Sequence, residues 1–441
     1  MTVGGRRGRA PGPLARLEAA LDRVDERPLD GTIKNVGALA GLPPSSIAQA
    51  GFKLFDGQVS FPQLILSRPT MLANIKAMQA FADVSGAWLA PHGKSTMAPH
   101  IFDAQLRAGA WGITVATAHQ ALVCRTFGIG RILVANELRW PGDIADLVRE
   151  LTEDPAFELL ALVDDVENVS MWADAARASN LVRPVSLLAE FGWRGGRTGV
   201  RDLPSLERVV DAIAAAAPWV RPVGIEGYEG IAPGSSDPER AAAVETYLTT
   251  LADAARRLRP RFPVPRPIVS AGGSVYFDRV VVHLGRDALP EYQLVLRSGG
   301  YVTHDSGLYA RSSPMAGSSD RLPGFSRLAP ALTLWGVVLS RPEAGIAIVG
   351  IGHRDAPSRI DLPVVQWLVR DGTLSAVTPP VPIRRMDDQH AYVDASGAFD
   401  PMPGDLVGCG ISHPCEAFER WRVVLEVDEA DRIIGAIPTF F

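Results

Sequence analysis

Between about residues 60 and 300, short apolar runs alternate with amphipathic helical patterns, and this alternation limits the possible folds more than any other feature of the chain. Runs such as GITVAT, RILVAN and FELLALVDD are rich in Val, Ile and Leu without alternation, which is typical of parallel strands covered on both faces. Seven or eight strand–helix units in this length favour a closed (β/α)8 barrel over an open sheet. The sequence therefore predicts an α/β barrel over residues 60–310.

The pattern changes after a segment rich in glycine, serine and proline that ends near residue 325. Beyond it, short apolar runs such as ALTLWGVVLSR, GIAIVGIG and WRVVLEVD are separated by turn residues, with little helix. Residues 325–441 are therefore expected to form an all-β domain. Residues 1–59 are expected to form an N-terminal extension, helical in part, which packs on the barrel or adds a strand to the β-domain.

Composition excludes several classes of function. The net charge of −5 provides no general basic field for nucleic acid. No apolar stretch approaches the roughly 18 residues needed to span a bilayer, and the first residues lack the apolar segment of a secretory signal. Three cysteines are too few for a disulfide scaffold, which fits a reducing compartment. The chain is therefore expected to be cytoplasmic, with a small-molecule substrate and no nucleic-acid or membrane partner.

Only four lysines occur in the chain, namely Lys34, Lys53, Lys76 and Lys94. Lys94 is the one that directly follows a predicted barrel strand, GAWLAP, together with His92. Functional groups of a parallel barrel lie at the carboxyl ends of its strands. Lys94 is therefore the best candidate for chemistry that requires an amine, and the alternative is a solvated loop lysine.

Two late strands end in the glycine-rich sequences SAGGS and RSGGY. Small residues let backbone N–H groups and a hydroxyl approach a phosphate closely. Each pair of glycines alone is more often a turn, but late loops are the usual phosphate location in a barrel. A strand-end lysine and a late phosphate cradle suit pyridoxal phosphate (PLP), whose aldehyde reacts with an amine and whose ring accepts electrons from a substrate carbanion.

The β-domain contains GCGISHPCEAF, in which His413 and Cys415 are two positions apart. On an extended backbone both side chains would point the same way, and imidazole with thiolate suits zinc better than magnesium. Two ligands could form an open site completed by water or substrate, and the alternative is a half-exposed histidine beside a core cysteine. Gln389 and His390 in DDQHAY are second-tier candidates for lining the site or for acid–base work, with a surface histidine as the alternative.

These motifs together resemble those of the fold-type III PLP enzymes in the D-serine dehydratase and D-threonine aldolase family, which have an alanine-racemase-like barrel followed by a β-domain. The resemblance covers roughly residues 60 to 440 and rests on APHGKSTMAPHIFDAQLRAGAWGITVAT, AEFGWRGGRTGV, GIEGYEG, SAGGS, RSGGYV and ISHPC, in this order. Within the family the chain is most similar to bacterial amino acid deaminases, whose C-terminal motifs are similar to DDQHAY and GISHPC.

The resemblance implies roles for individual residues. Lys94 would carry the cofactor covalently, and His413 and Cys415 would bind the metal. A cysteine at the second metal position is typical of the dehydratases that use zinc, whereas the aldolases tend to have aspartate. The resemblance also implies a head-to-tail homodimer in which each active site uses both chains. The residues expected to bind the cofactor are Lys94, His92, Arg197, Tyr228, Gly272, Gly273, Ser274, Gly300 and Tyr301.

The predicted activity is that of a PLP- and zinc-dependent dehydratase, an ammonia-lyase that converts a D-3-hydroxy amino acid such as D-serine into an oxo acid and ammonia. Three alternatives remain: a metal-dependent D-threonine-type aldolase, an amino-acid racemase that needs no metal, and a non-catalytic PLP-binding protein. The β-domain and its SHPC motif argue against the last. Ala90, Ser95, Thr96 and Met97 depart from the family pattern, which leaves the contacts to the substrate carboxylate undefined.

Overall fold

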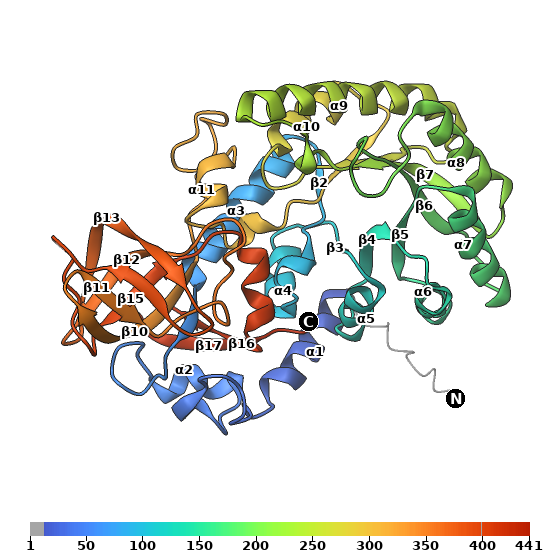
Figure 1. The fold of residues 1–441 in the computed structure, drawn as a ribbon. Coiled ribbons are helices and arrows are strands. Elements are labelled where there is room, and N and C mark those ends of the chain that lie inside the picture. The colour runs from blue at the N-terminus through green and yellow to red at the C-terminus, as the bar shows by residue number, and fades with distance from the viewer. Residues whose placement is uncertain (1–12, 398) are drawn as a thin grey trace, which may run out of the picture.

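The computed structural model describes residues 13–397 and 399–441, and its central part is a sheet of eight parallel strands in the order β2-β9-β8-β7-β6-β5-β4-β3 (Figure 1). The amide of Trp111 donates to the carbonyl of Leu89 at 2.7 Å, and a bridge between His92 and Thr114 also joins β2 to β3, so the sheet closes. The barrel prediction is confirmed. The strands are β2 (Trp88–Leu89), β3 (Ile113–Val115), β4 (Arg131–Glu137), β5 (Glu158–Val163), β6 (Val185–Phe191), β7 (Val220–Gly227), β8 (Ile268–Ala271) and β9 (Gln293–Leu296).

Helices surround the barrel, and capping side chains begin several of them. Thr117, Asp165 and Asp202 each accept a hydrogen bond from the backbone amide three residues later, which satisfies a free N–H group of the first turn. Figure 1 shows α5 to α9 along the outer side of the sheet. The helices are α3 (Arg68–Val84), α4 (Pro99–Arg107), α5 (Ala118–Thr126), α6 (Pro141–Glu153), α7 (Val166–Ala178), α8 (Leu203–Ala215), α9 (Asp237–Leu258) and α10 (Phe277–Leu284), followed by the short α11 (Leu308–Ser312).

Apolar side chains fill the interior of the barrel. They form one buried cluster with a contribution from nearly every strand, so the barrel is a packed core and not a channel. The cluster separates the two ends of the barrel, and the carboxyl ends of the strands face the β-domain. Its buried members are Ala90, Leu133, Leu160, Leu162, Leu188, Val223, Ile268 and Val295.

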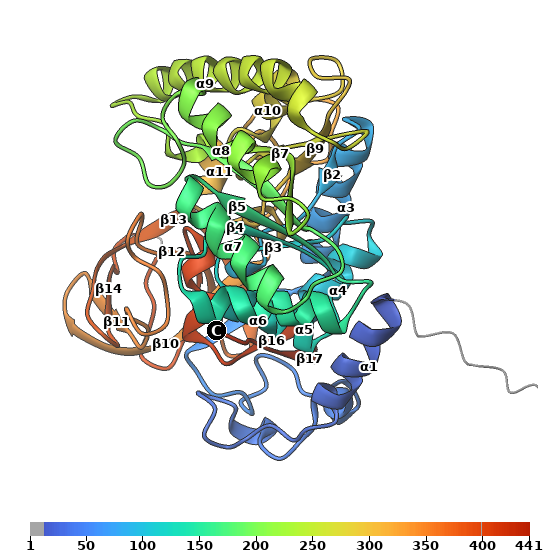
Figure 2. The same cartoon turned by 90° about the vertical axis from the view of Figure 1, so that its right-hand side faces the viewer.

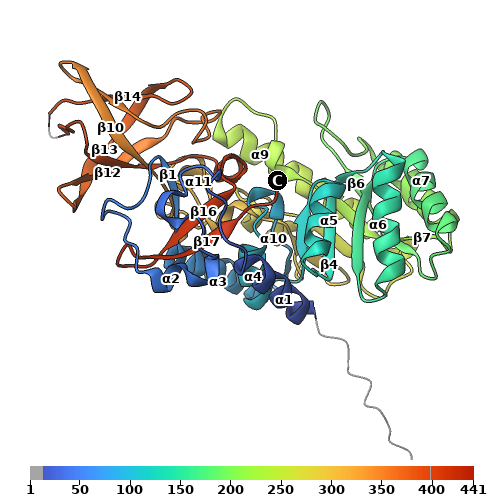
Figure 3. The ribbon, with the colours of Figure 1, turned by 90° about the horizontal axis from the view of Figure 1, so that it is seen from below.

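The C-terminal domain is all-β, as predicted, and forms a nine-stranded sheet in the order β11-β14-β13-β12-β15-β10-β1-β16-β17. Because β10 also pairs with β11, six of these strands close on themselves. Figure 3 shows β1, β16 and β17 between the rest of this sheet and the barrel. The strands after the barrel are β10 (Leu332–Glu343), β11 (Ile346–Val349), β12 (Val364–Arg370), β13 (Thr373–Met386), β14 (Ala391–Asp394), β15 (Leu406–Gly410), β16 (Val423–Val427) and β17 (Ile433–Pro438).

The first strand, β1 (Gln63–Ser67), falls within the range predicted for the barrel but pairs with the C-terminal sheet. It runs antiparallel to β10 and parallel to β16. The chain therefore passes through the β-domain before α3 begins the barrel. The boundary predicted at residue 60 differs from the structure at this point, because an apolar run does not reveal which sheet it joins.

The N-terminal extension contains α1 (Pro13–Asp25) and α2 (Ile47–Ala50), while residues 1–12 lie outside the described residues. Leu29, Leu39 and Ile47 share a buried cluster with β16 and β17 residues, and Figure 2 shows this segment below the β-domain and the barrel. The imidazole Nε2 of His100 lies 2.8 Å from a carboxylate oxygen of Asp25, which ties α1 to α4. No helix among the described residues is long and apolar enough to cross a membrane.

Candidate active site

A cavity of about 520 Å³ lies at the carboxyl ends of the barrel strands, and residues of both domains line it. It therefore has the position expected for an active site in this type of barrel. Most of the predicted site residues, which are far apart in the sequence, meet there within one chain. Those lining the cavity are His92, Lys94, Arg197, Tyr228, Gly272, Gly273, Ser274, Gly300, His413 and Cys415.

Lys94 follows β2 in a single turn of 3-10 helix, Gly93–Ser95, and is half-buried. Burial is the main cause that lowers the pKa of its amine, and the guanidinium groups of Arg197 and Arg297 lower it further against the opposing effect of Cys415. A lowered pKa increases the fraction of neutral amine at a given pH. Lys94 is therefore suited to bind an aldehyde and to accept a proton.

The aromatic ring of Tyr228 lies near two cationic side chains. The guanidinium carbon of Arg197 is 4.8 Å from the ring centroid, and that of Arg297 is 5.9 Å from it. Burial raises the pKa of the Tyr228 hydroxyl to about 12, so this group stays protonated at neutral pH. Burial and the nearby charges of Lys94 and Arg297 hold the pKa of His92 well below its usual range, so its imidazole is neutral.

The two glycine-rich loops contact each other, since the Ser274 hydroxyl accepts a hydrogen bond from the Gly300 amide at 3.2 Å. However, the amides of Gly272 and Gly273 donate to the buried carboxylate of Glu229 at 3.0 and 2.6 Å. The expectation that these two amides approach a phosphate therefore differs from the structure, in which a carboxylate of the protein already accepts from both.

The glycines nevertheless keep the cavity open beside its tyrosines. Gly272 has a backbone φ of 98°, which residues with a side chain rarely adopt. A methyl group on Gly273 would come within 2.9 Å of the Tyr228 ring. A methyl group on Gly300 would overlap the ring of Tyr309. An amine, small-residue loops and a flanking tyrosine ring together fit PLP.

Tyr301, which was also predicted to bind the cofactor, does not line the cavity. Its side chain is buried, and its hydroxyl accepts a hydrogen bond from the Gln105 side chain at 3.0 Å. The structure thus places Tyr301 in the wall behind the glycine loop. Its contribution to cofactor binding stays a prediction.

A buried carboxyl cluster, which sequence reasoning missed, lies at the ends of β4, β6 and β7 and consists of Glu137, Glu190 and Glu226. Burial raises the pKa of Glu226 to about 8 even though Arg297 forms an ion pair with it. Burial, followed by the contact with Glu190, raises the pKa of Glu137 to about 10. Glu190 and Glu226 line the cavity, so a carboxyl group with a raised pKa, that of Glu226, is available there. The available signal was a charged residue within otherwise apolar strands such as SLLAEF and VGIEG.

His413 and Cys415 lie beside the Lys94 loop, and the Cys415 thiol donates to the Ser95 hydroxyl at 3.2 Å. The local backbone is not extended, which corrects the basis of the prediction. His413 has a left-handed conformation with a φ of 54°, and Pro414–Glu416 form a 3-10 turn. The amide of His413 donates to the buried carboxylate of Asp305 at 2.8 Å, which helps to hold this conformation.

The two side chains affect each other's protonation. Burial alone would raise the pKa of the Cys415 thiol, but the contacts with His413 and Ser95 outweigh it and lower the pKa. The contact with Cys415 raises the pKa of His413. Within residues 13–397 and 399–441, no group of three or more histidine, cysteine or acidic side chains is arranged to hold a metal ion. A metal bound here would therefore have two protein donors, with further positions left for water or substrate, and the imidazole–thiolate pair fits zinc.

Gln389 and His390 lie elsewhere in the structure. Both are exposed at the turn between β13 and β14 and do not line the cavity of the same chain. Their role in the site stays a prediction.

Comparisons with known proteins agree with this architecture. Residues 67–283 match the family model described as "Alanine racemase, N-terminal domain", and residues 331–427 match the one described as "Putative serine dehydratase domain". A D-threonine aldolase of an Arthrobacter species is 27% identical over 378 residues, covering 84% of this chain and 89% of the relative. A 3-hydroxy-D-aspartate aldolase of Paracoccus denitrificans is 27% identical over 226 residues, covering 51% of this chain and 57% of the relative.

Solved structures support the fold. The D-threonine aldolase from Filomicrobium marinum has a TM-score of 0.73 at 24% identity and covers 88% of this chain and 96% of its own. The D-threo-3-hydroxyaspartate dehydratase from a Delftia species has a TM-score of 0.67 at 21% identity, and the match covers 88% of this chain and 99% of the dehydratase. Two further structures are variants of a dehydratase of that name, in which a histidine and a cysteine two positions apart are each replaced by alanine, and the cysteine variant is in a metal-free form.

Proposed function

Because the chain belongs to the fold-type III PLP enzymes, with homologues named D-threonine aldolase and 3-hydroxy-D-aspartate aldolase, we propose that it is a metal-assisted dehydratase of D-3-hydroxy amino acids. The observation that carries the proposal is the meeting of Lys94 with His413 and Cys415 in one cavity. The thiol of Cys415 lies 3.2 Å from the hydroxyl of Ser95, which is the residue after Lys94. An amine for the cofactor and a soft donor pair for a metal are thus side by side.

Lys94 would hold PLP, with Tyr228 beside the ring and Ser274 and Gly300 near the phosphate. When bound, PLP supplies an aldehyde for amines and a ring that withdraws electrons from the substrate Cα. The amine of Lys94, whose pKa is lowered, would accept the α-proton. Glu190 and Glu226 lie on the same cavity wall, where Glu226 is paired with Arg297 and keeps that guanidinium in place.

His413 and Cys415 would hold zinc, which supplies Lewis-acid stabilisation for a departing β-hydroxyl. Support for this assignment comes from the same His-x-Cys spacing in the variants of the dehydratase, one of which is metal-free. A thiolate donor also favours zinc over magnesium or manganese. Loss of hydroxide, and not cleavage of Cα–Cβ, is the outcome that we assign to this donor pair.

The test combines spectroscopy, metal analysis and product analysis. The purified protein should absorb near the edge of the visible range, contain zinc, and release ammonia from D-serine or another D-3-hydroxy amino acid. Lys94→Ala should lose the absorbance band and turnover together. Cys415→Ala should keep the band and lose at least about 100-fold in turnover, in the range found for loss of a catalytic group. Cys409→Ala, which changes a buried cysteine outside the cavity, is the matched control. Full turnover in Cys415→Ala would contradict the metal role.

A D-threonine-type aldolase is the second candidate, and the similarity to the Arthrobacter aldolase over 84% of this chain favours it. The aldolase would break Cα–Cβ and yield glycine with an aldehyde, whereas the dehydratase yields ammonia and an oxo acid. Measuring both product pairs over a panel of D- and L-3-hydroxy amino acids separates the two activities.

A further inference from the structure

A second cavity, of about 450 Å³, lies at the opposite end of the barrel, where the strands begin. It shares no lining residue with the active-site cavity. Four arginines line it, and each is located at the start of a different barrel strand. Arg131 is the first residue of β4, Arg221 is the second residue of β7, and Arg183 and Arg266 precede β6 and β8. Glu158 is the one acidic side chain among the lining residues, so the cavity has an excess of positive charge.

The guanidinium of Arg131 donates two hydrogen bonds to the carboxylate of Glu158, at 3.0 and 2.6 Å. The other three guanidiniums bind neutral acceptors instead. Arg221 donates to the Ser186 hydroxyl at 3.1 Å, and Arg266 donates to the Tyr292 carbonyl at 3.0 Å. In the described part of the chain, these cations have no carboxylate partner within the distance of an ion pair, although most other arginines of the protein have one.

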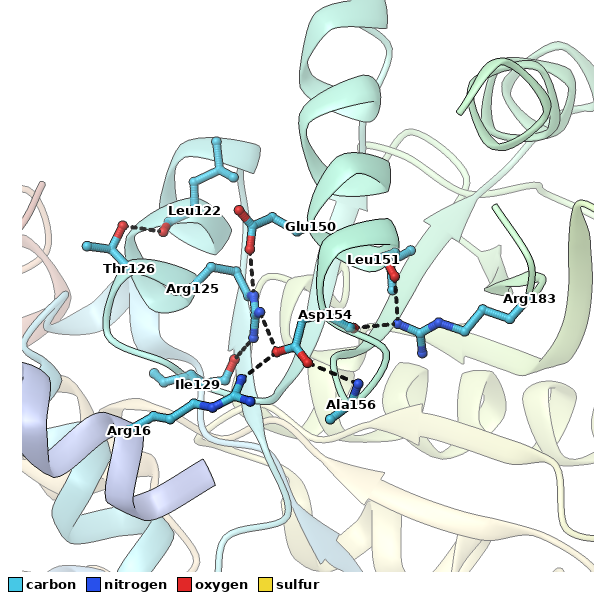
Figure 4. Close-up of polar contacts among 10 residues, drawn as sticks. All are labelled: Arg16, Leu122, Arg125, Thr126, Ile129, Glu150, Leu151, Asp154, Ala156 and Arg183. Carbon is cyan, nitrogen blue, oxygen red and sulfur yellow. Dashed lines mark hydrogen bonds and ion pairs between the residues drawn. The ribbon is translucent and has the colours of Figure 1, made fainter. Parts of the chain in front are cut away.

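The guanidinium of Arg183 binds backbone carbonyls and has no ion pair with a carboxylate of the described residues (Figure 4). Its guanidinium donates to the backbone carbonyls of Leu151 and Asp154, at 3.1 and 3.0 Å. The carboxylate of Asp154 points instead toward Arg16 and Arg125, each at 2.8 Å. The Asp154 carboxylate is therefore already used by two other arginines. Burial lowers the pKa of Arg183, and the charge of Arg221 adds to this effect, against the opposing charges of Asp154 and Glu158.

Two stacked tryptophans form another part of the cavity wall. The rings of Trp88 and Trp111 are 5.1 Å apart and nearly parallel, and the Arg131 guanidinium lies 4.7 Å from the Trp111 ring. Trp88 is 40% exposed, so an aromatic surface faces the solvent beside the arginines. Positive charges close together around a cavity repel one another, and a bound anion would reduce this repulsion. Guanidinium groups bind phosphate oxygens through pairs of parallel hydrogen bonds.

We propose that this cavity binds a small phosphate-bearing molecule, with Arg183, Arg221 and Arg266 as its anion contacts. This site is separate from the active site and does not depend on the proposed reaction. The phosphate groups could belong to a nucleotide, whose base would stack on Trp88, or to a phosphate compound without a base.

The test titrates the full-length holoenzyme with pyrophosphate, ATP and citrate, following heat by calorimetry and tryptophan fluorescence. Pyrophosphate or ATP should bind saturably, with an affinity that falls as salt increases. The Arg221→Gln/Arg266→Gln protein should bind at least tenfold more weakly. The Arg149→Gln/Arg177→Gln protein, which loses the same charge from exposed positions on α6 and α7, should bind like the wild type. Thermal unfolding of both variants checks that they fold.

Tighter binding of ATP than of pyrophosphate, lost in Trp88→Phe, would identify the ligand as a nucleotide, and equal binding would identify a phosphate compound without a base. Citrate that binds as tightly as the phosphate compounds would overturn the proposal, as would unchanged binding in Arg221→Gln/Arg266→Gln. Absence of saturable binding for all three anions would show that only salt counter-ions occupy the cavity.

Discussion

Glu229 is fully buried, and its carboxylate accepts hydrogen bonds from the amides of Gly272 and Gly273. Replacing it with alanine leaves two buried N–H groups without a partner, at a cost of about 1–3 kcal/mol each. We therefore expect Glu229→Ala to lower the thermal midpoint of the cofactor-free protein and to weaken PLP binding by at least about tenfold. Glu229→Gln, which keeps one oxygen acceptor, should lose less. Absorbance titration with PLP measures the affinity, and Glu429→Ala in an exposed turn is the control.

Single residues of the site differ in how well the sequence predicts them. Lys94 and the glycine loops could be found because they follow apolar strands at the end where barrel sites form. Glu226 and Arg297 were not predicted, although each is a charged residue in or directly after an apolar strand, because an apolar run alone does not indicate which positions face the cavity. The same limit applies to Glu229, whose partners are about 43 residues away in the sequence and meet it only through the barrel.

At the scale of elements, an ion-pair network attaches α1 to the barrel (Figure 4). Asp154, at the end of α6, accepts from Arg125 of α5 and from Arg16 of α1. Burial alone would raise the pKa of Asp154, but Arg125, the Ala156 amide and Arg16 outweigh it and lower the pKa below its usual 3.8. The interaction therefore stabilises the fold above about pH 3.8 and is lost as the pH falls through the lower folded-state pKa.

Asp154→Asn should remove this contribution, about 1–3 kcal/mol of unfolding free energy at pH 7. The difference from the wild type should shrink as the pH is lowered toward the pKa of the folded state. Urea unfolding at several pH values measures this difference. Asp174→Asn, which breaks an exposed i,i+3 pair with Arg177 on α7, should cost far less. A constant difference at all pH values would show that Asp154 acts through packing and not through its charge.

The strand β1 is part of the β-domain sheet, and its alternate side chains pack toward the barrel on one face and toward the N-terminal extension on the other. Leu64 and Leu66 belong to the large core that includes barrel residues, whereas Ile65 belongs to the core under the N-terminal extension. Leu66→Ala, at a fully buried position, should destabilise the protein by about 2–5 kcal/mol. Chemical denaturation with tryptophan fluorescence and circular dichroism measures the loss. Leu72→Ala, at a 43% exposed position of α3, should change stability little.

At the scale of the whole molecule, the sequence was sufficient to predict a barrel followed by a β-domain, because the change in periodicity near residue 325 is clear. It did not reveal β13, since Thr373–Met386 contains three prolines and is mostly exposed, so it lacks the apolar pattern of a core strand. Nor did it predict that His413 and Cys415 reach Lys94 within one chain. That contact depends on how the two domains are positioned, which local patterns do not encode.

The position of β1 has a consequence for how the protein is made. This strand leaves the ribosome before any of its partners exist, and β10 and β16 are synthesised only after the entire barrel. An apolar segment of the nascent chain therefore stays unpaired while more than half of the polypeptide is translated. For the same reason, a gene fragment encoding only residues 325–441 would yield a sheet that lacks the strand between β10 and β16, and a peptide spanning β1 could occupy that position.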